Sequence, residues 1–326
     1  MQPNMSMNIT DSLAVRQVSA NRYESLRFPE KMGNSANIAF GGCTLGVAAA
    51  AVHEGVSEPY RLYSFTGQFL GPALTARKLM CTVREVRKTR SFITKVVEVS
   101  QKQDNGSERT CLIALADFHT IEPASLLIYS KHPSTEHSSV QNSPSVAEHR
   151  QNLVRSGATS AESAELHTKA FGLMAKFFDN KICPEAINGQ CLVGFGTAAK
   201  TTQDHLPLVE RTAADWIRCR QPLETPGQHA SSLAFVMDAA ISFLPLTLSG
   251  LSLSDAGACS TLDFSLRFLT NEVNINEWHL REWRTIAADG GRTYSEAQLW
   301  DQDGKMVVSM TQSSILRSKA NGTSKL

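Results

Sequence analysis

Residues 41–52 read GGCTLGVAAAAV, and this run of small side chains decides the fold. Its alanine content favours a helix, and its small residues allow that helix to pack closely against a sheet. Extended segments rich in β-branched and aromatic residues follow it, at 61–70, 78–86, 91–101 and 110–120. Asp104-Asn105-Gly106 joins the last two and is a strong hairpin signal. This region is predicted to be one helix followed by an antiparallel meander.

A second region repeats the same order of elements. A helix is predicted over 231–248, and extended segments are predicted at 260–269, 278–287, 293–300 and 306–316. Phe69-Leu70 in the first copy corresponds to Phe268-Leu269 in the second. Two copies of a long helix wrapped by an antiparallel β-sheet make an α+β fold of the double hotdog type.

The predicted boundaries follow from composition. A flexible N-terminus covers 1–19, the first hotdog 20–122 and the second hotdog 171–318, with a short tail at 319–326. Between the two copies, 123–170 is rich in serine, proline and charged residues and is predicted to be a mobile linker, because it has few apolar groups to offset the entropy of ordering. Its histidines lack the regular spacing of a metal site, so no metal is expected.

The overall composition excludes several classes of protein. The net charge of +1 argues against nucleic acid or an anionic membrane as the main partner. The start of the chain has no secretory signal, and no apolar stretch approaches the ~20 residues that span a bilayer. The 7 cysteines form no C-x-x-C pair and are interpreted as buried thiols. A protein that does not cross the membrane is expected.

The chain ends in Ser324-Lys325-Leu326, a tripeptide that an import receptor reads as a peroxisomal address. It follows a flexible polar run at 319–323. We therefore expect a location in the peroxisome matrix, with the import receptor as a partner. Many reactions of acyl-CoA take place in that compartment, so acyl-CoA is the first substrate class to consider.

The polar residues that could carry chemistry lie in the second copy. Asp238 lies within an otherwise apolar predicted helix, where an unpaired charge is costly. Thr261 begins the next predicted strand and Gln312 lies in the last one. Because the helix of a hotdog lies across the strands, these three side chains can converge. By register we expect Ala49 or Ala50 at the position of Asp238 in the first copy, which would leave that half catalytically empty.

Several familiar motifs are missing from the sequence. There is no G-x-S-x-G nucleophile elbow, no G-x-G-x-x-G between a strand and a helix, and no P-loop. An acyl-serine mechanism and a nucleotide cofactor are therefore disfavoured, and we expect no cofactor.

The chain resembles the acyl-CoA thioesterase II family, whose members are double hotdog enzymes of bacteria and peroxisomes. The likeness covers about 20–120 and 180–318. It is carried by Phe40-Gly41-Gly42, by the helix from Leu233 to Asp238 with His229 before it, by Thr261-Leu262-Asp263, by Asn276-Glu277-Trp278, and by the hairpin at Asp303-Gly304.

The resemblance implies hydrolysis of acyl-CoA thioesters by direct attack of an activated water. The family's Asp–Thr–Gln trio falls on Asp238 as the base and on Thr261 and Gln312 as the residues that hold the water. Backbone N–H groups at Gly41 or Gly42 are candidates for the oxyanion site. The resemblance also implies association into homo-oligomers.

Two alternatives stay open on the sequence alone. Hotdog enoyl-CoA hydratases pair an aspartate with a histidine five residues later, and counting five from Asp238 gives Phe243. A non-catalytic acyl-CoA-binding protein is the other alternative, and the intact trio argues against it. The acyl chain length, and whether the pathway belongs to primary or secondary metabolism, do not follow from the sequence.

Overall fold

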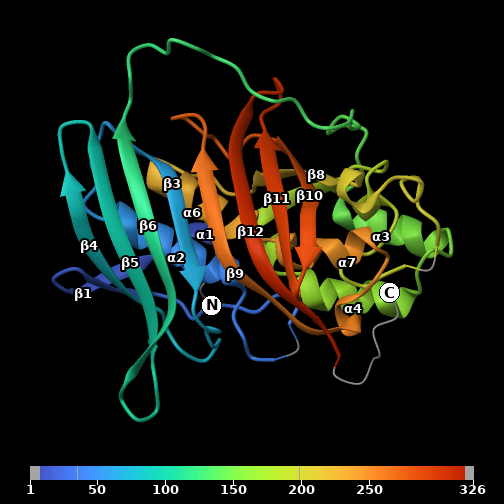
Figure 1. Ribbon diagram of the computed structural model, residues 1–326, viewed down its shortest axis with the longest axis horizontal. Helices are drawn as coiled ribbons and strands as arrows, with labels where there is room; N and C mark the ends of the chain where they lie inside the picture. The colour runs from blue at the N-terminus through green and yellow to red at the C-terminus, as the bar shows by residue number, and fades with distance from the viewer. Residues whose placement is uncertain (1–7, 35, 198, 320–326) are drawn as a thin grey trace, which may run out of the picture.

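The computed structural model describes residues 8–34, 36–197 and 199–319, which form one antiparallel sheet with helices against it (Figure 1). The sheet has 12 strands in the order β1-β2-β4-β5-β6-β3-β9-β12-β11-β10-β8-β7. The first six of these strands come from the N-terminal half of the chain and the last six from the C-terminal half. The second half repeats the order of the first in reverse, so the fold has an approximate two-fold axis between β3 and β9.

The first half consists of the following elements: α1 (Ile9–Leu13), β1 (Val15–Ser19), β2 (Arg22–Ser25), α2 (Gly41–His53), β3 (Tyr60–Phe69), β4 (Met80–Lys88), β5 (Phe92–Lys102) and β6 (Glu108–Thr120). The predicted helix and four strands of this region are all present, with ends displaced by a few residues. The sequence pattern missed α1 and the hairpin of β1 and β2, which extends the sheet beyond β4.

The second half consists of the following elements: α5 (Met174–Phe177), β7 (Phe178–Ile182), β8 (Ala213–Cys219), α6 (Pro226–Met237), α7 (Leu244–Leu248), β9 (Ala256–Phe268), β10 (His279–Asp289), β11 (Arg292–Trp300) and β12 (Met306–Ser318), with short 3₁₀ turns η1 (Ile187–Gly189), η2 (Leu208–Glu210), η3 (Ile241–Phe243) and η4 (Leu253–Asp255). The double hotdog fold is confirmed. The two halves meet where β3 pairs with β9, with Thr66 opposite Ser265.

The two long helices, α2 and α6, pack against each other behind the centre of the sheet (Figure 1). Glycines permit this contact. A Cβ on Gly42 would lie 2.3 Å from the backbone oxygen of Phe235, and a Cβ on Gly46 would lie 2.7 Å from Leu13 and 3.2 Å from the oxygen of Ser231. Distances this short are not accessible to a larger side chain without displacement of the backbone. The small residues of 41–52 thus set the separation of the helices.

The helix predicted over 231–248 is wrong as a single helix. It begins earlier, at Pro226, and α6 ends at Met237 with Asp238 as its C-cap. Ala240 then adopts a left-handed backbone conformation with φ of 73°, and η3 leads into α7. Pro245 lies in the first turn of α7, where its missing N–H costs nothing. Because the whole segment is apolar, its sequence pattern does not predict the break after Met237, which places Asp238 at the end of a helix.

The segment 226–248 is also long and apolar enough to cross a membrane by length and composition alone. However, 89% of its most apolar 18-residue window is buried inside the protein. Its position against α2 and the sheet explains its composition.

Two predicted flexible segments carry more structure than their composition indicates. Within 1–19, Ile9 and Leu13 of α1 are buried and β1 pairs with β2. Within 123–170, two helices form, α3 (Val146–Arg155) and α4 (Ala161–Phe171). Ser145 and Glu148 form a capping box at the start of α3, and Ser160 caps α4. Local capping, rather than a large apolar face, starts these helices, which is why the hydrophobic pattern missed them.

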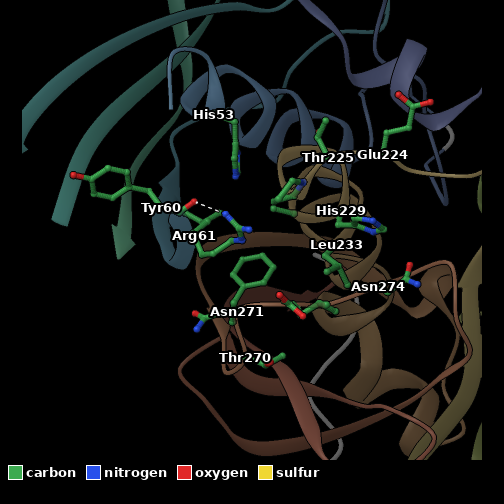
Figure 2. Close-up of a pocket in the computed structure, with 16 residues that line it drawn as sticks. His53, Tyr60, Arg61, Glu224, Thr225, His229, Leu233, Thr270, Asn271 and Asn274 are labelled. Atoms are coloured by element: carbon green, nitrogen blue, oxygen red, sulfur yellow. Dashed lines mark hydrogen bonds between the residues drawn. The ribbon is translucent and has the colours of Figure 1, made fainter. Parts of the chain in front are cut away.

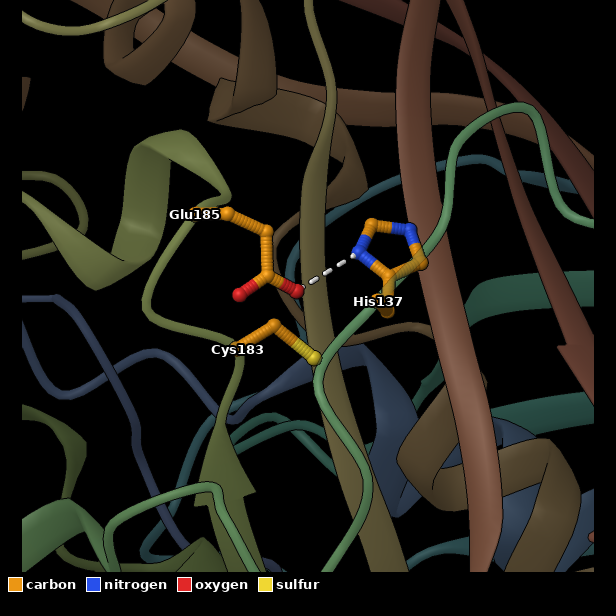
Figure 3. A group of neighbouring side chains, drawn as sticks. All are labelled: His137, Cys183 and Glu185. Atoms are coloured by element: carbon orange, nitrogen blue, oxygen red, sulfur yellow. Dashed lines mark hydrogen bonds and ion pairs between the residues drawn. The ribbon is translucent and has the colours of Figure 1, made fainter.

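The linker is attached to the second half by His137, which lies between the carboxylates of Glu185 and Glu282. Figure 3 shows its contact with Glu185. Its Nε2 is 2.9 Å from Glu282 Oε2, and its Nδ1 is 3.3 Å from Glu185 Oε1. Ser134 donates to Glu282, and Ser138 donates to Glu185. Burial by itself raises the pKa of Glu282, but the hydrogen bonds of His137 and Ser134 outweigh it and hold that pKa below the ordinary value. The linker is thus attached by polar contacts instead of an apolar core.

The tail that carries Ser324-Lys325-Leu326 lies outside the described residues.

We expect Gly46→Val to lower the free energy of unfolding by ~1–3 kcal/mol, because the added methyl groups overlap Leu13 and the backbone of Ser231. Urea unfolding followed by circular dichroism measures this change. Ala161→Val adds the two methyl groups of valine at an exposed first helical position of α4 and serves as the control. Equal stability of Gly46→Val and the wild type would contradict the close packing of the helices.

Candidate active site

Asp238 lies at the C-terminal end of α6 and is only 6% exposed. Burial raises the pKa of its carboxyl group to about 6, although hydrogen bonds from Gln312 and from the backbone N–H of Gly42 act in the opposite direction. A carboxylate with this pKa is mostly ionised at neutral pH and is still basic enough to accept a proton. The buried position therefore gives Asp238 the properties of a general base.

Gln312 and Thr261 form a hydrogen-bonded chain to Asp238. The Nε2 of Gln312 donates to Asp238 Oδ1 at 2.6 Å, and Thr261 Oγ1 donates to Gln312 Oε1 at 3.3 Å. The two residues come from neighbouring strands, β12 and β9, which pair with Ser314 opposite Thr261. The structure therefore brings together the three residues that the sequence indicated. Gln312 is completely buried and contacts the carboxylate directly.

Gly41 and Gly42 lie beside Asp238 at the start of α2. A Cβ on Gly41 would lie 2.6 Å from Asp238 Oδ2, so only glycine fits there without displacing the carboxylate. The N–H of Gly42 is engaged by Asp238. Of the two predicted oxyanion donors, Gly42 therefore holds the base, which leaves the amide of Gly41 as the candidate.

A cavity of about 470 Å³ opens at this point. Its wall contains Asp238, Thr261 and Gly41, and Gln312 stands behind them. Four segments form much of it: the start of α2, the end of α6, the residues that follow β3, and the start of β9. The loop before α2 and residues of α4, β6, β12 and the segment after α6 complete the wall. Large apolar side chains line the rest: Phe40, Phe69, Phe171, Phe243, Leu262 and Ile315. The site therefore combines a polar end with an apolar chamber, as a binding pocket for an apolar chain requires.

Phe171 is a lining residue that the sequence analysis did not identify. It ends α4, next to the polar segment, and its ring lies 5.8 Å from that of Phe243. A single aromatic residue at the end of a polar stretch gives no periodic signal. The role of Phe171 in the wall can be recognised only from the tertiary structure, in which the end of α4 lies against the cavity.

The expected alanine at the position equivalent to Asp238 is wrong. α2 spans 13 residues, and α6 spans 12 followed by its C-cap Asp238. When Gly41 is aligned with Pro226, His53 falls on Asp238. The strand pairing gives the other two equivalents. Gln312 lies opposite Phe264 as Ala116 lies opposite Phe65, and Thr261 corresponds to Leu62, at the same bulge in each half. The first half thus lacks the trio but carries a histidine at the base position.

Two residues in the motifs of the resemblance have structural positions away from Asp238. The side chain of Asn276 donates to the backbone oxygen of Gln221 and accepts from the N–H of Leu223, so it holds the loop before α6. His229 lies in the first turns of α6, at the opposite end of the helix from Asp238.

One cluster in the described part of the chain could hold a metal ion. The ligand atoms of His137, Cys183 and Glu185 lie within 4.8 Å of one another (Figure 3). Both ring nitrogens of His137 are already engaged by carboxylates, which accounts for the arrangement without an ion. The cluster lies outside the cavity of Asp238, and the absence of a metal stays a prediction.

Comparisons with known proteins identify the class. The model for the acyl-CoA thioesterase C-terminal domain matches residues 185–316, and that for the N-terminal domain matches 28–119. A search of curated proteins gave no match.

Among solved structures, an acyl-CoA thioesterase II, TesB2, from Mycobacterium marinum is 18% identical with a TM-score of 0.67, and the alignment covers 96% of this chain and 98% of that one. A tesB protein from Mycobacterium avium subsp. paratuberculosis is 15% identical with a TM-score of 0.66, covering 94% and 96%. A protein with a hot dog fold from Alicyclobacillus acidocaldarius is 16% identical with a TM-score of 0.65, covering 95% and 98%. At these identities the structures establish the fold.

Fold and cavity together define a hotdog protein with a carboxylate poised at an apolar chamber. The two domain models cover both halves, so the chain belongs to the acyl-CoA thioesterase family. It is an acyl-CoA thioester hydrolase, and the hydratase and binding-protein alternatives are not favoured.

We expect Gln312→Leu to move the acid limb of the activity profile to higher pH. Gln312 donates to the ionised form of Asp238, and its loss raises the pKa of that carboxyl group above about 6. A hydrogen bond to a charged group contributes ~1.5–3 kcal/mol, which corresponds to about one pH unit or more. The pH dependence of kcat/KM measures the shift. Gln298→Leu, on the neighbouring strand β11, is the control and should leave the limb in place.

Proposed function

We propose that the protein hydrolyses acyl-CoA by direct attack of a water molecule that Asp238 activates. The observation that supports this most is the buried carboxylate of Asp238, which receives a hydrogen bond from Gln312 and faces the cavity. A base of pKa about 6 can remove a proton from water as the water attacks a thioester carbonyl. No nucleophilic side chain is required.

The roles of the other residues follow from their places. Thr261 lines the cavity next to the base and is assigned to hold the attacking water, which its hydroxyl oxygen can do as an acceptor while its proton is donated to Gln312. Gln312 is assigned to orient Asp238, since its amide contacts the carboxylate and not the cavity. This assignment differs from the expectation that both residues hold the water.

The proposed reaction has two steps. Water adds to the thioester carbonyl carbon while Asp238 takes its proton, and the carbonyl oxygen becomes an oxyanion. The N–H of Gly41, at the positive end of α2, is placed to stabilise that charge. The carbon–sulfur bond then breaks, and the proton on Asp238 passes to the CoA thiolate. Free acid and CoA result, and Asp238 returns to its ionised form.

We expect Asp238→Asn to lower kcat for thiol release from straight-chain acyl-CoAs by ~10²–10⁴-fold, because the amide cannot accept the proton. In the wild type, activity should rise with pH through about 6, because the base must be ionised to work. A thiol-reactive dye measures both effects.

Asp289→Asn removes an exposed carboxylate at the end of β10 and is the matched control. Equal rates for Asp238→Asn and the wild type would remove Asp238 from the mechanism.

The proposed place of action is the peroxisome matrix. The support is the terminal Ser324-Lys325-Leu326, a tripeptide that the peroxisomal import receptor binds. An acyl-CoA hydrolase has its substrate class in that compartment.

We expect a fluorescent protein fused to the N-terminus to accumulate in peroxisomes of a eukaryotic host, and removal of 324–326 to leave it diffuse. Co-localisation with a peroxisomal membrane marker is the measurement. Leu326→Lys keeps the length of the tail and tests whether the tripeptide itself is read. Punctate signal from the truncated protein would contradict this address.

A further inference from the structure

A second cavity, of about 270 Å³, lies at the opposite end of the pair formed by α2 and α6 (Figure 2). Its four parts correspond to four of the segments that line the catalytic cavity, with the halves exchanged. The start of α6, the end of α2, the start of β3 and the residues that follow β9 enclose it. The approximate two-fold axis between β3 and β9 therefore relates the two cavities.

The equivalence extends to individual contacts. Gly42, whose N–H is engaged by Asp238, corresponds to Gly227, and a Cβ on Gly227 would lie 3.1 Å from the ring of His53. In each cavity a glycine at the start of one long helix allows a close approach by the residue at the end of the other. The second cavity has therefore kept the construction of a substrate site.

We propose that this second cavity binds a second molecule of acyl-CoA and does not hydrolyse it. The proposal rests on the acyl-CoA substrate class assigned above. It is drawn from the shape that the two halves share and from the side chains that differ between them.

The chemistry of hydrolysis is missing from the second cavity. Leu62 and Ala116 occupy the positions of Thr261 and Gln312, and neither can hold a water or orient a base. His53 replaces the carboxylate. Its Nδ1 lies 2.7 Å from the carbonyl oxygen of Ala49 and must donate to it, so Nε2 is left as an acceptor. Burial lowers the pKa of His53 to about 4, which makes it a weak base.

The walls suit an acyl chain with a polar arm. Leu62, Leu233, Phe268 and Val273 give an apolar surface, and Figure 2 shows His53 and His229 directed into the space between the helices and the loop after β9. The free Nε2 of His53 can accept from an amide N–H, and the arm of coenzyme A contains two such amides. Among the described residues, His229 Nδ1 has no hydrogen-bond partner.

Two positively charged side chains lie at one side of the opening of the second cavity. Tyr60 lines the cavity, and its hydroxyl donates to the backbone oxygens of Thr89 and Arg90 in the loop between β4 and β5. Arg90 in this loop and Lys88 at the end of β4 are exposed and form no ion pair within the described ranges. The equivalent turn beside the catalytic cavity, 288–291, reads Ala-Asp-Gly-Gly. The phosphates of a bound CoA would lie on the Tyr60 side, away from Glu224 (Figure 2).

Binding stoichiometry tests the proposal. Asp238→Asn prevents turnover, and titration calorimetry with octanoyl-CoA should give two molecules bound per chain. In the same background, Asn271→Trp fills the opening of the second cavity and should leave one. Gln302→Trp places the same side chain in the exposed turn after β11 and should leave two. Gly41→Val, which fills the catalytic cavity, should also leave one.

The charge of the loop gives a second readout. Arg90→Glu should weaken the second binding event by about tenfold, because a charge-assisted contact to phosphate is lost. Lys102→Glu, an equal change at the far end of β5, should leave both events unaltered.

The outcomes separate the two proposals. A single molecule per chain that Gly41→Val removes and Asn271→Trp leaves unchanged would overturn the second site alone. Octanoate that binds the second cavity as tightly as octanoyl-CoA would overturn acyl-CoA as its ligand. Thiol release by the wild type is measured separately and reports only on the catalytic cavity, so failure of that function is distinguishable.

Discussion

The contact between α2 and α6 is the constraint on which the rest of the structure depends. Gly42 and Gly46 let the two helices approach until backbone meets backbone, and that approach places the first turn of α2 against the last turn of α6. Asp238 is buried by this contact and receives the N–H of Gly42 because of it. The packing of small residues and the basicity of the carboxylate therefore have one cause. A wider separation would admit water, lower the pKa of Asp238 and remove the hydrogen bond.

At the other end of the α2–α6 contact, the end of α2 lies against the start of α6, and the side chains there differ from those around Asp238. The two-fold arrangement gives each helix start a partner helix end, so two chambers are a geometric consequence of the duplicated fold. Only one retains Asp, Thr and Gln at the meeting point. In the other, His53, Leu62 and Ala116 stand at the equivalent positions. The repeated fold supplies both enclosures, and the side chains at three equivalent positions are what differs between them.

The connection between the halves adds to the catalytic side. Its first part is held to β10 by the hydrogen bonds of His137 and Ser134 to Glu282, and its second part ends at Phe171 in the wall of the cavity. A polar segment thus completes an apolar chamber with one aromatic ring. The polar attachment also satisfies a carboxylate that the sheet would otherwise bury alone, which is costly.

The sequence by itself determined the helix-and-meander order and the duplication, and it indicated three polar residues that the structure brings together. These features have local signals that can be recognised without knowing which residues lie close in space. The signals are the small residues at 41–52, the alternating pattern of the strands and the isolated polar residues Asp238, Thr261 and Gln312. The tertiary structure decided what depends on contacts between distant segments. The break after Met237, the capped helices of the linker and the placement of Phe171 have weak local signals, since their apolar partners lie far away in the chain. The alignment of His53 with Asp238 could be made only once the ends of α2 and α6 were known, because the continuous apolar sequence gives no signal for those ends.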